Sequence, residues 1–351
     1  MSLRIGILMS LTGPGELDWT PVKRALDLLP KQAGGRAVEF HLADDQADPA
    51  QAVREAETLV NELGVHAIAH FSLSGPAIAV AAVAKRHALL HFVLSPIELN
   101  PGDDAWTFRL SPRASLMAEA LMSRIKISGI RRVAYVGTND NYGNSWRRLI
   151  TSLGSSLGVE IAAQAAYARG DTCLDGAAAV TDAAPECVII GGPGNTAPMP
   201  HRALRESGFD GLIFHTFGAD MRALANQPRQ LFDGTLMVTG PGSLAEAVPA
   251  DSPCRAEIDA YERAYADLHG ERPVSQAAIS VWDLKRIIEA TASKIDPAEP
   301  ASRQGLKEAL LSCGAITAGS GVFRYRESDH FGLGEEARII VQLQDGVWHP
   351  V

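Results

Sequence analysis

Short apolar runs alternate with stretches of helical period along most of the chain. The runs form two successive series. The first series is Arg4–Ser10, Val38–Asp44, Ala67–Ser72, Leu89–Ser95 and Trp106–Pro112. The second series is Arg132–Thr138, Glu160–Ala168, Cys187–Gly192, Leu212–Gly218 and Thr235–Gly240. Strands that alternate with helices at this spacing predict parallel sheets built from βαβ units. Two series therefore predict an α/β protein with two lobes, each a doubly wound parallel sheet.

The first clear helix signal follows the second apolar run. Asp48 is a typical N-cap, and Pro49 stands at the first helical position, where proline is favoured. Gln51 is placed to complete a capping box with Asp48. Apolar residues then recur with a helical period until Gly64, which is expected to end the helix.

The last third of the chain has a different pattern. After the tenth apolar run, two long amphipathic helices are predicted at Arg255–His269 and Ser275–Lys294. Gly319-Ser320-Gly321 precedes Val322–Arg326, and apolar and polar residues then alternate over Arg338–Gln344. Asp345-Gly346 is a strong hairpin turn signal, so the chain is predicted to finish as a β-hairpin.

A chain organised in this way crosses between its lobes three times. We expect the crossovers at Leu110–Arg113, Val238–Gly242 and Gly319–Phe323. Open parallel sheets bind ligands beyond the carboxyl ends of their strands, so a ligand cleft is expected between the two lobes. Three short crossovers restrict relative motion to a hinge, which favours clam-like closure.

The bulk properties fit two domains and exclude some functions. The 351 residues are enough for an N-terminal lobe of 1–111 plus 242–321 and a C-terminal lobe of 112–241 plus 322–351. A net charge of −9 without basic clusters argues against a nucleic-acid partner. No apolar stretch reaches the ~20 residues that span a bilayer, so direct membrane insertion is not expected.

Two glycine-rich segments match the sequence pattern of a dinucleotide-binding motif. Gly192–Ala197 and Gly240–Ala245 both match G-x-G-x-x-A. Both follow late strands rather than the first one, and both have proline after the first glycine, so tight turns are the better interpretation. The four cysteines contain no C-x-x-C pair, which argues against a zinc site. We therefore expect no cofactor, no metal and no catalytic residue.

Polar residues at the ends of the first lobe's strands are the better candidates for binding. Ser72–Gly75 joins the third strand to a helix, and its hydroxyls and free N–H groups suit a carboxylate or carbonyl oxygen. Ser72 or Ser74 is also expected to cap that helix. Asp44 and Asp45 end the second strand; they could bind a cation or act as acid and base. We expect them instead to cap the next helix and line the cleft.

Several short motifs occur together in a specific order. They are Ile5–Gly15 with its Leu-Thr-Gly-Pro-Gly end, Asp44–Pro49, Ser72–Gly75, Leu94-Ser95-Pro96, Phe108–Pro112 and Val133–Gly143. Each is weak alone, but their order and spacing resemble the type I periplasmic solute-binding proteins, in the branched-chain amino-acid receptor branch, over nearly the whole chain. The resemblance implies a non-enzymatic receptor that closes on a small-molecule ligand and delivers it to an ABC permease.

The resemblance also implies individual ligand contacts. Trp19 matches an aromatic wall over the ligand side chain, and Ser74 matches a hydroxyl that holds the ligand carboxylate. Ile97 matches a carbonyl that accepts from the ligand amine, and Tyr142 matches a tyrosine of the second lobe that faces the cleft. The full set of implied ligand residues is Trp19, Ser72, Leu73, Ser74, Ser95, Ile97, Glu98, Tyr142, Gly194, Phe217 and Asp220.

Three departures from the family pattern bear on the ligand. Leu99 stands where a carboxylate-binding threonine is expected, and Pro193 or Gly194 stands where an aromatic residue is expected. Gly218 replaces the acid that pairs with the ligand ammonium, leaving Asp220 or Glu98 as substitutes. A buried unpaired charge is costly. We therefore expect a ligand without a full α-amino-acid group, such as a small carboxylate, an aromatic acid or an amide.

Two other functions are consistent with the same pattern. One is a cytosolic sensor of the same fold, similar to the amide sensors that control amidase operons. The other is a dehydrogenase on a doubly wound sheet, which would bind nicotinamide nucleotides. For the receptor, we expect a periplasmic or extracytoplasmic location after removal of a leader peptide; the sensor would be cytoplasmic.

Overall fold

The computed structural model describes residues 2–13, 19–100, 102–273, 275 and 277–351. The chain forms two compact units. The first contains Met1–Pro112 and Ala250–Ala337, and the second contains Arg113–Pro249 and Arg338–Val351. The sequence analysis placed the second and third boundaries at 241/242 and 321/322. The structure keeps 242–249 with the second unit and 322–337 with the first.

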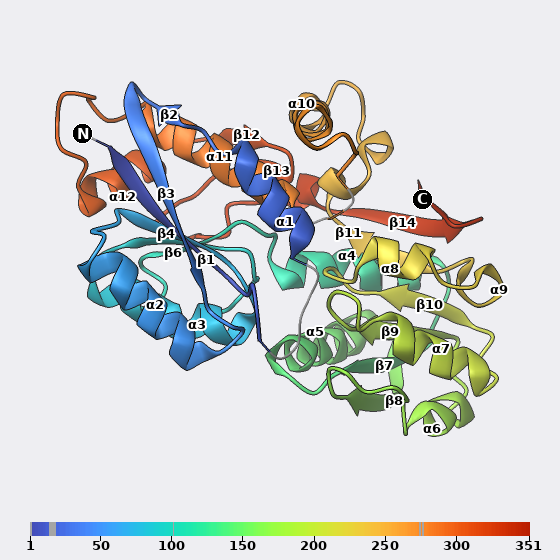
Figure 1. Cartoon of the computed structure of the whole chain (residues 1–351). Helices are drawn as coiled ribbons and strands as arrows, with labels where there is room; N and C mark the ends of the chain where they lie inside the picture. Colours follow the sequence, from blue (N-terminus) through green and yellow to red (C-terminus); the bar gives the residue numbers. More distant parts are fainter. Residues whose placement is uncertain (1, 14–18, 101, 274, 276) are drawn as a thin grey trace. The chain divides into compact units, whose positions relative to one another are not determined.

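The first unit is built on a mostly parallel sheet (Figure 1). Its strand order is β2-β3-β1-β4-β5-β6, with only β2 antiparallel to its neighbour. The strands are β1 (Leu3–Met9), β2 (Gln32–Ala33), β3 (Arg36–Asp44), β4 (Ala67–Phe71), β5 (Leu90–Val93) and β6 (Thr107–Arg109). A separate hairpin is formed by β12 (Ile316–Ala318) and β13 (Gly321–Phe323).

Helices cover the sheet of the first unit. In Figure 1, α2 and α3 lie on one face, and α11 and α12 lie on the other. The helices are α1 (Thr20–Ala25), α2 (Pro49–Asn61), α3 (Ser74–Arg86), α10 (Pro253–His269), α11 (Ile279–Ala292) and α12 (Arg303–Ser312). Single 3₁₀ turns occur at Leu26–Leu28 and Glu335–Ala337. The predicted helix Ser275–Lys294 is α11, although Gln276 lies outside the described residues.

The second unit repeats the plan. Its sheet has the order β15-β14-β11-β10-β9-β7-β8. The strands are β7 (Arg132–Thr138), β8 (Glu160–Tyr167), β9 (Cys187–Gly191), β10 (Leu212–His215), β11 (Leu236–Thr239), β14 (Ile339–Gln344) and β15 (Val347–Pro350). The helices are α4 (Ala114–Ile127), α5 (Asn141–Leu157), α6 (Ala177–Asp182), α7 (Pro198–Glu206), α8 (Met221–Ala225) and α9 (Arg229–Phe232), with 3₁₀ turns at Pro241–Ser243 and Ala245–Ala247.

The alternation of side chains along β7 creates two cores in the second unit. Val133 and Tyr135 pack in one cluster with buried residues of α4 and α5. Ala134 and Val136 pack in another with residues of α6 and α7. Successive side chains of a strand point to opposite faces, so one buried strand serves both layers. This arrangement explains why the central strands read as continuous apolar runs.

The sequence predictions of the elements are confirmed in type. Each of the ten apolar runs contains a strand, in β1 and in β3 to β11. Asp48 caps α2 by accepting a hydrogen bond from the N–H of Gln51. The capping box is wrong, because the Gln51 side chain contacts Glu55 and Arg54 instead. The Asp345-Gly346 turn joins β14 to β15 with positive φ at both residues, as a tight hairpin turn requires.

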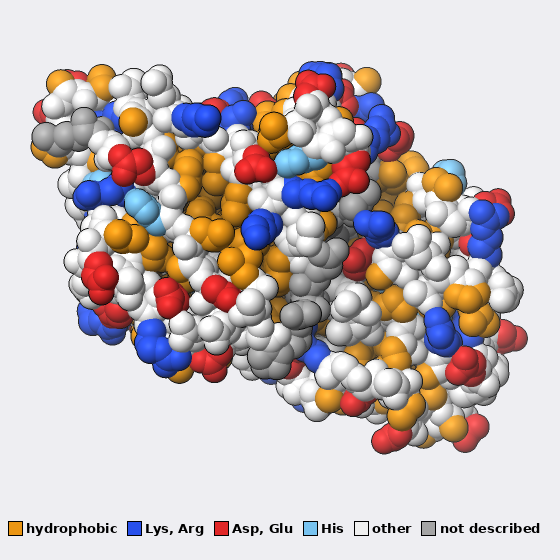
Figure 2. Space-filling model, viewed as in Figure 1, with side chains coloured by type: hydrophobic (Ala, Val, Ile, Leu, Met, Phe, Trp, Pro, Cys, Tyr) orange, Lys and Arg blue, Asp and Glu red, His pale blue; other side chains and the backbone are white. Residues whose placement is uncertain are grey.

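Charge is spread over both units. Figure 2 shows acidic and basic side chains interspersed on the visible face of each. No helix in the described ranges is both long and apolar enough to cross a membrane. Within the same residues, no group of three or more His, Cys, Asp or Glu side chains is arranged to hold a metal ion.

Candidate functional site

The turn between β4 and α3 presents unused hydrogen-bond donors. Ser74 is the first residue of α3, and Leu73 is its N-cap, in an extended conformation. Among the described residues, the Ser74 hydroxyl and the N–H groups of Ser74 and Gly75 have no hydrogen-bond partner. The first N–H groups of a helix lack intrahelical acceptors and attract anions. The turn is therefore well suited to an anionic or carbonyl oxygen.

The expected capping by serine is wrong at this turn. No side chain caps α3. Ser72 is buried, and its hydroxyl lies 2.7 Å from the hydroxyl of Ser10. Because Ser10 donates its own proton to Asp45, Ser72 donates to Ser10. Ser72 therefore supports the turn from beneath, while Ser74 remains available at its surface.

Asp44 and Asp45 also differ from the expectation that they cap a helix. Asp44 accepts hydrogen bonds from the N–H groups of Leu11 and Thr12 and from the Thr12 hydroxyl. Burial raises the pKa of Asp44, but these bonds and one from Gln46 outweigh it and hold the pKa below its ordinary value. Asp48 caps the helix instead. The family motif around Thr12 extends to Pro14 and Gly15, which lie outside the described residues.

The loop after β5 is fixed to the same turn. The Ser95 hydroxyl donates to the carbonyl of Ser72 at 2.7 Å. Ile97 is buried against Ala77 and Val93. The Ile97 carbonyl accepts two hydrogen bonds from the Arg109 guanidinium, at 2.7 and 3.0 Å. Both of its lone pairs are therefore in use, which disfavours the expected role of this carbonyl toward a ligand amine.

Arg109 is the organising residue of this region, and the sequence analysis missed it. Its side chain is 1% exposed and pairs with Asp104. It also donates to the carbonyl of Thr107 and lies 4.7 Å from the ring centre of Phe331. A strand-terminal arginine within an apolar run was the available signal, because a buried guanidinium requires several acceptors.

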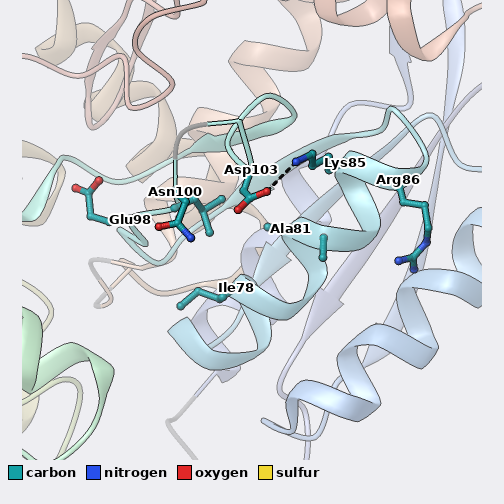
Figure 3. Close-up of a pocket in the computed structure, with 9 residues that line it drawn as sticks. Ile78, Ala81, Lys85, Arg86, Glu98, Asn100 and Asp103 are labelled. Atoms are coloured by element: carbon teal, nitrogen blue, oxygen red, sulfur yellow. Dashed lines mark hydrogen bonds and ion pairs between the residues drawn. The ribbon is translucent and has the colours of Figure 1, made fainter.

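A pocket lies beside the loop after β5 on the first unit (Figure 3). It has a volume of about 530 Å³, and its lining includes the apolar side chains of Ile78 and Leu99. Lys85 and Asp103 form an ion pair at 2.8 Å within its lining. Of the predicted ligand residues, only Glu98 lines this pocket. The pocket and the Ser74 turn are therefore lined by different residues.

Trp19 directly precedes α1 and serves as its N-cap without a side-chain hydrogen bond. Its side chain is half-buried. Within the described part of the chain, the indole makes no hydrogen bond or ring contact. An aromatic ring of this kind is free to pack on a ligand, so its proposed role remains a prediction.

In the second unit, the structure brings together Tyr142, Gly194, Phe217 and Asp220. The Tyr142 hydroxyl donates to the carbonyl of Phe217 and lies 3.0 Å from the Thr216 hydroxyl. Burial raises the pKa of Tyr142 well above its ordinary value. Gly194 donates to Gly218 at 2.7 Å, and its carbonyl accepts from the N–H of Asp220. The loops after β9 and β10 are thus joined next to the start of α5.

The missing acid at position 218 has a structural reason. Gly218 has a φ of +102°, and a Cβ there would lie 3.1 Å from the Tyr142 hydroxyl. A side chain at this position would be strained and would crowd Tyr142. Asp220, the expected substitute, caps α8 by accepting from the N–H groups of Arg222 and Ala223. Its Oδ1 atom is therefore already occupied.

Comparisons with known proteins agree with this fold. A sequence model described as periplasmic binding protein matches residues 2–346. The chain is 28% identical to an extracellular ligand-binding receptor from Rhodopseudomonas palustris HaA2, with a TM-score of 0.94 over 100% of both chains. A second extracellular ligand-binding receptor from Rhodopseudomonas palustris is 27% identical, with a TM-score of 0.92 over 100% of this chain and 99% of that one.

A more distant structure shares the fold alone. It is an ABC transporter solute-binding protein from R. palustris in complex with benzoate, 18% identical, with a TM-score of 0.78 over 100% of this chain and 96% of that one. A search of curated proteins gives no match. The family resemblance inferred from the sequence motifs is confirmed: the chain belongs to the periplasmic binding protein family and has the type I fold of that family.

Proposed function

We propose that this protein is an extracytoplasmic solute-binding receptor of an ABC transporter that captures a small carboxylate or amide. The family match and the similarity to two extracellular ligand-binding receptors support the receptor class. The family also favours an extracytoplasmic location over a cytosolic sensor. In this proposal, the ligand first binds the first unit, the two units then close on it, and the closed form is recognised by a permease.

The proposed ligand class rests on one observation: the candidate site has more free hydrogen-bond donors than free acceptors. At the Ser72–Gly75 turn, the hydroxyl of Ser74 and two backbone N–H groups are unused among the described residues. These donors satisfy a carboxylate or an amide carbonyl. A ligand carboxylate would also gain from the partial positive charge at the N-terminus of α3, which is 13 residues long.

The acceptors expected near the Ser72–Gly75 turn and at position 218 are engaged or absent, and Glu98 lines the separate pocket. The Ile97 carbonyl is bound by Arg109, and Asp220 accepts from two N–H groups through one oxygen. Gly218 offers no side chain. An α-amino acid has an ammonium as well as a carboxylate, and burying the ammonium without a partner would cost several kcal/mol. A ligand that lacks the ammonium avoids this cost.

Replacing Ser74 by alanine is expected to weaken ligand binding by about 1–3 kcal/mol, because a buried ligand oxygen loses one hydrogen bond. The measurement is isothermal titration calorimetry with the tightest ligand among acetate, 3-methylbutanoate, benzoate and acetamide. Circular dichroism should show no change in secondary structure, since Ser74 caps no helix.

Ser302→Ala is the matched control for Ser74→Ala. Ser302 also stands at the start of a helix in the first unit, but there its hydroxyl caps α12 by accepting from Gly305. This variant should lose about 1 kcal/mol of stability and retain ligand affinity. Equal affinity in Ser74→Ala and the unmodified protein would remove Ser74 from the binding site.

A further inference from the structure

A continuous chain of buried polar side chains runs beneath the Ser72–Gly75 turn. It crosses the first unit's sheet from β6 to β5 and β4, and ends at the loops after β3, β1 and β4. Its members are Thr107, His91, His70, Asp45, Ser10 and Ser72, each no more than 7% exposed. None of these residues had a role in the ligand contacts derived above, except Ser72 as a support of the turn.

The distances define the order of the contacts. His91 Nδ1 lies 3.3 Å from Thr107 Oγ1, and His91 Nε2 lies 3.3 Å from His70 Nδ1. His70 Nε2 lies 2.7 Å from Asp45 Oδ2. On its other oxygen, Asp45 accepts from the Ser10 hydroxyl at 2.8 Å and from the Ala47 N–H at 2.9 Å. The Ser10 hydroxyl in turn lies 2.7 Å from that of Ser72.

The histidine nitrogens and the Asp45 carboxylate of this network are paired with or without one extra proton. With His70 neutral, its Nε2–H donates to Asp45, and its Nδ1 accepts from His91, which accepts in turn from Thr107. With His70 protonated, both of its nitrogens donate, and His91 reverses to accept from His70 and donate to Thr107. Buried polar groups are costly when unpaired, so a network whose two histidines keep their partners in both states is suited to gaining and losing a proton.

The geometry places that proton on His70, which lies between the Asp45 carboxylate and His91. Burial raises the pKa of Asp45, but the hydrogen bond and charge of His70, with the hydrogen bond from Ser10, leave it below its ordinary value. Burial lowers the pKa of His91 far below its ordinary value, and the charges of His70 and Arg109 lower it further. Arg109, the nearby cation of β6, is itself paired with Asp104. The network thus has one anion, Asp45, and one proton acceptor beside it.

We propose that this network positions the Ser72–Gly75 turn and that the proton on His70 tunes the affinity of the turn for an anion. With the proton, Asp45 and His70 carry no net charge together; without it, the network carries one buried negative charge. That negative charge opposes a carboxylate at Ser74, whereas the hydrogen bond from His70 Nε2 to Asp45 is kept in both states. Carboxylate affinity should therefore be higher at low pH and should fall as His70 loses its proton. The affinity part of this inference rests on the proposed function.

The first test needs no ligand. In the unliganded protein labelled with ¹⁵N, the ring nitrogens of His70 and the amides of Ser74 and Gly75 are followed by NMR from about pH 5 to about pH 9. We expect the two amide signals to move with the same midpoint as the His70 ring. A His70 ring that does not titrate in this range, or one that titrates while both amides stay still, would overturn the proposal.

Asp45→Asn removes the charge while keeping the shape. The amide accepts from Ser10 and Ala47 through its oxygen and donates to His70, which moves its proton to Nδ1 and still donates to His91. This variant should fold, and the coupled movement of the Ser74 and Gly75 amides with pH should disappear. His87→Gln is the control, because His87 forms a similar pair with Glu57 on the surface of the same unit, outside the network. The control should keep the full coupled movement.

The second test measures affinity for the tightest carboxylate among acetate, 3-methylbutanoate and benzoate. From about pH 6 to about pH 9, Kd should rise about three- to tenfold in the unmodified protein and in His87→Gln, and stay flat in Asp45→Asn. A Kd that is independent of pH, alongside coupled amide movement, would refute tuning of affinity. If none of these carboxylates binds, the carboxylate form of the proposed function fails, and the NMR titration alone decides the positioning role.

Discussion

Arg109→Met is expected to lower the free energy of unfolding of the first unit by about 3–5 kcal/mol. Methionine fills much of the space that the arginine side chain occupies but donates no hydrogen bond. The carbonyls of Ile97 and Thr107 would be left buried without their donor, and Asp104 would lose its counter-charge. The packing of the guanidinium on Phe331 would also be lost. Hydrogen exchange measured by mass spectrometry should show faster exchange in 90–110.

Two further variants identify the cause of the Arg109 effect. Arg109→Lys retains the charge but cannot donate two parallel bonds to Ile97, so it should recover only part of the lost stability. Arg24→Met removes a surface arginine that pairs with Glu271, and it should cost less than about 1 kcal/mol. Full stability in Arg109→Lys would show that charge, rather than the hydrogen bonds to the 95–99 loop, matters at this position.

Gly143→Ala is expected to lower the free energy of unfolding of the second unit by about 3 kcal/mol, near the upper end of overpacking effects. Gly143 is the third residue of α5, directly after Tyr142. A Cβ there would lie 1.9 Å from the backbone carbonyl oxygen of Thr138, so the helix start must move away from β7. The hydrogen bond from Tyr135 to the Gly143 carbonyl would be disturbed by the same movement.

Gly305→Ala provides the matched comparison for Gly143→Ala. Gly305 is also the third residue of its helix, α12, but its Cβ would meet only the hydroxyl oxygen of Ser302, which can rotate away. Moving this hydroxyl weakens the cap of α12, and the higher helix propensity of alanine offsets part of that loss, so this variant should lose less than about 1 kcal/mol. Urea denaturation followed by circular dichroism measures both. Equal midpoints for the two variants would show that the contact of α5 with β7 is not tight.

The strands were predictable from the sequence because buried parallel strands produce continuous apolar runs. Runs such as Leu212–Gly218 were longer than the observed strand β10, because apolar and small residues continue into the turn that follows. The end of the chain was also predictable, since Asp345-Gly346 favours one kind of tight turn. These signals are local: they depend on neighbouring residues and on periodicity.

The candidate site was predictable in its location but less so in its contacts. The resemblance pointed to the Ser72–Gly75 turn, yet it could not separate Ser72, which is buried against Ser10, from Ser74, which is not. The hydrogen bonds from Arg109 to the Ile97 carbonyl depend on how the loop after β5 packs against β6. The absence of an acid at Gly218 was visible in the sequence, but its cause, the positive φ and the nearby Tyr142 hydroxyl, was not.

The most direct test of the ligand class is a thermal-shift screen of the unmodified protein. The panel contains acetate, 3-methylbutanoate, benzoate, acetamide, leucine, isoleucine and valine. A ligand at one hundred times its Kd adds about 2.7 kcal/mol of stability, which gives a clear rise in Tm. We predict a rise with at least one acid or amide and none with the three amino acids. A clear rise with leucine, isoleucine or valine would show that the ammonium has a partner and would contradict the proposed ligand class.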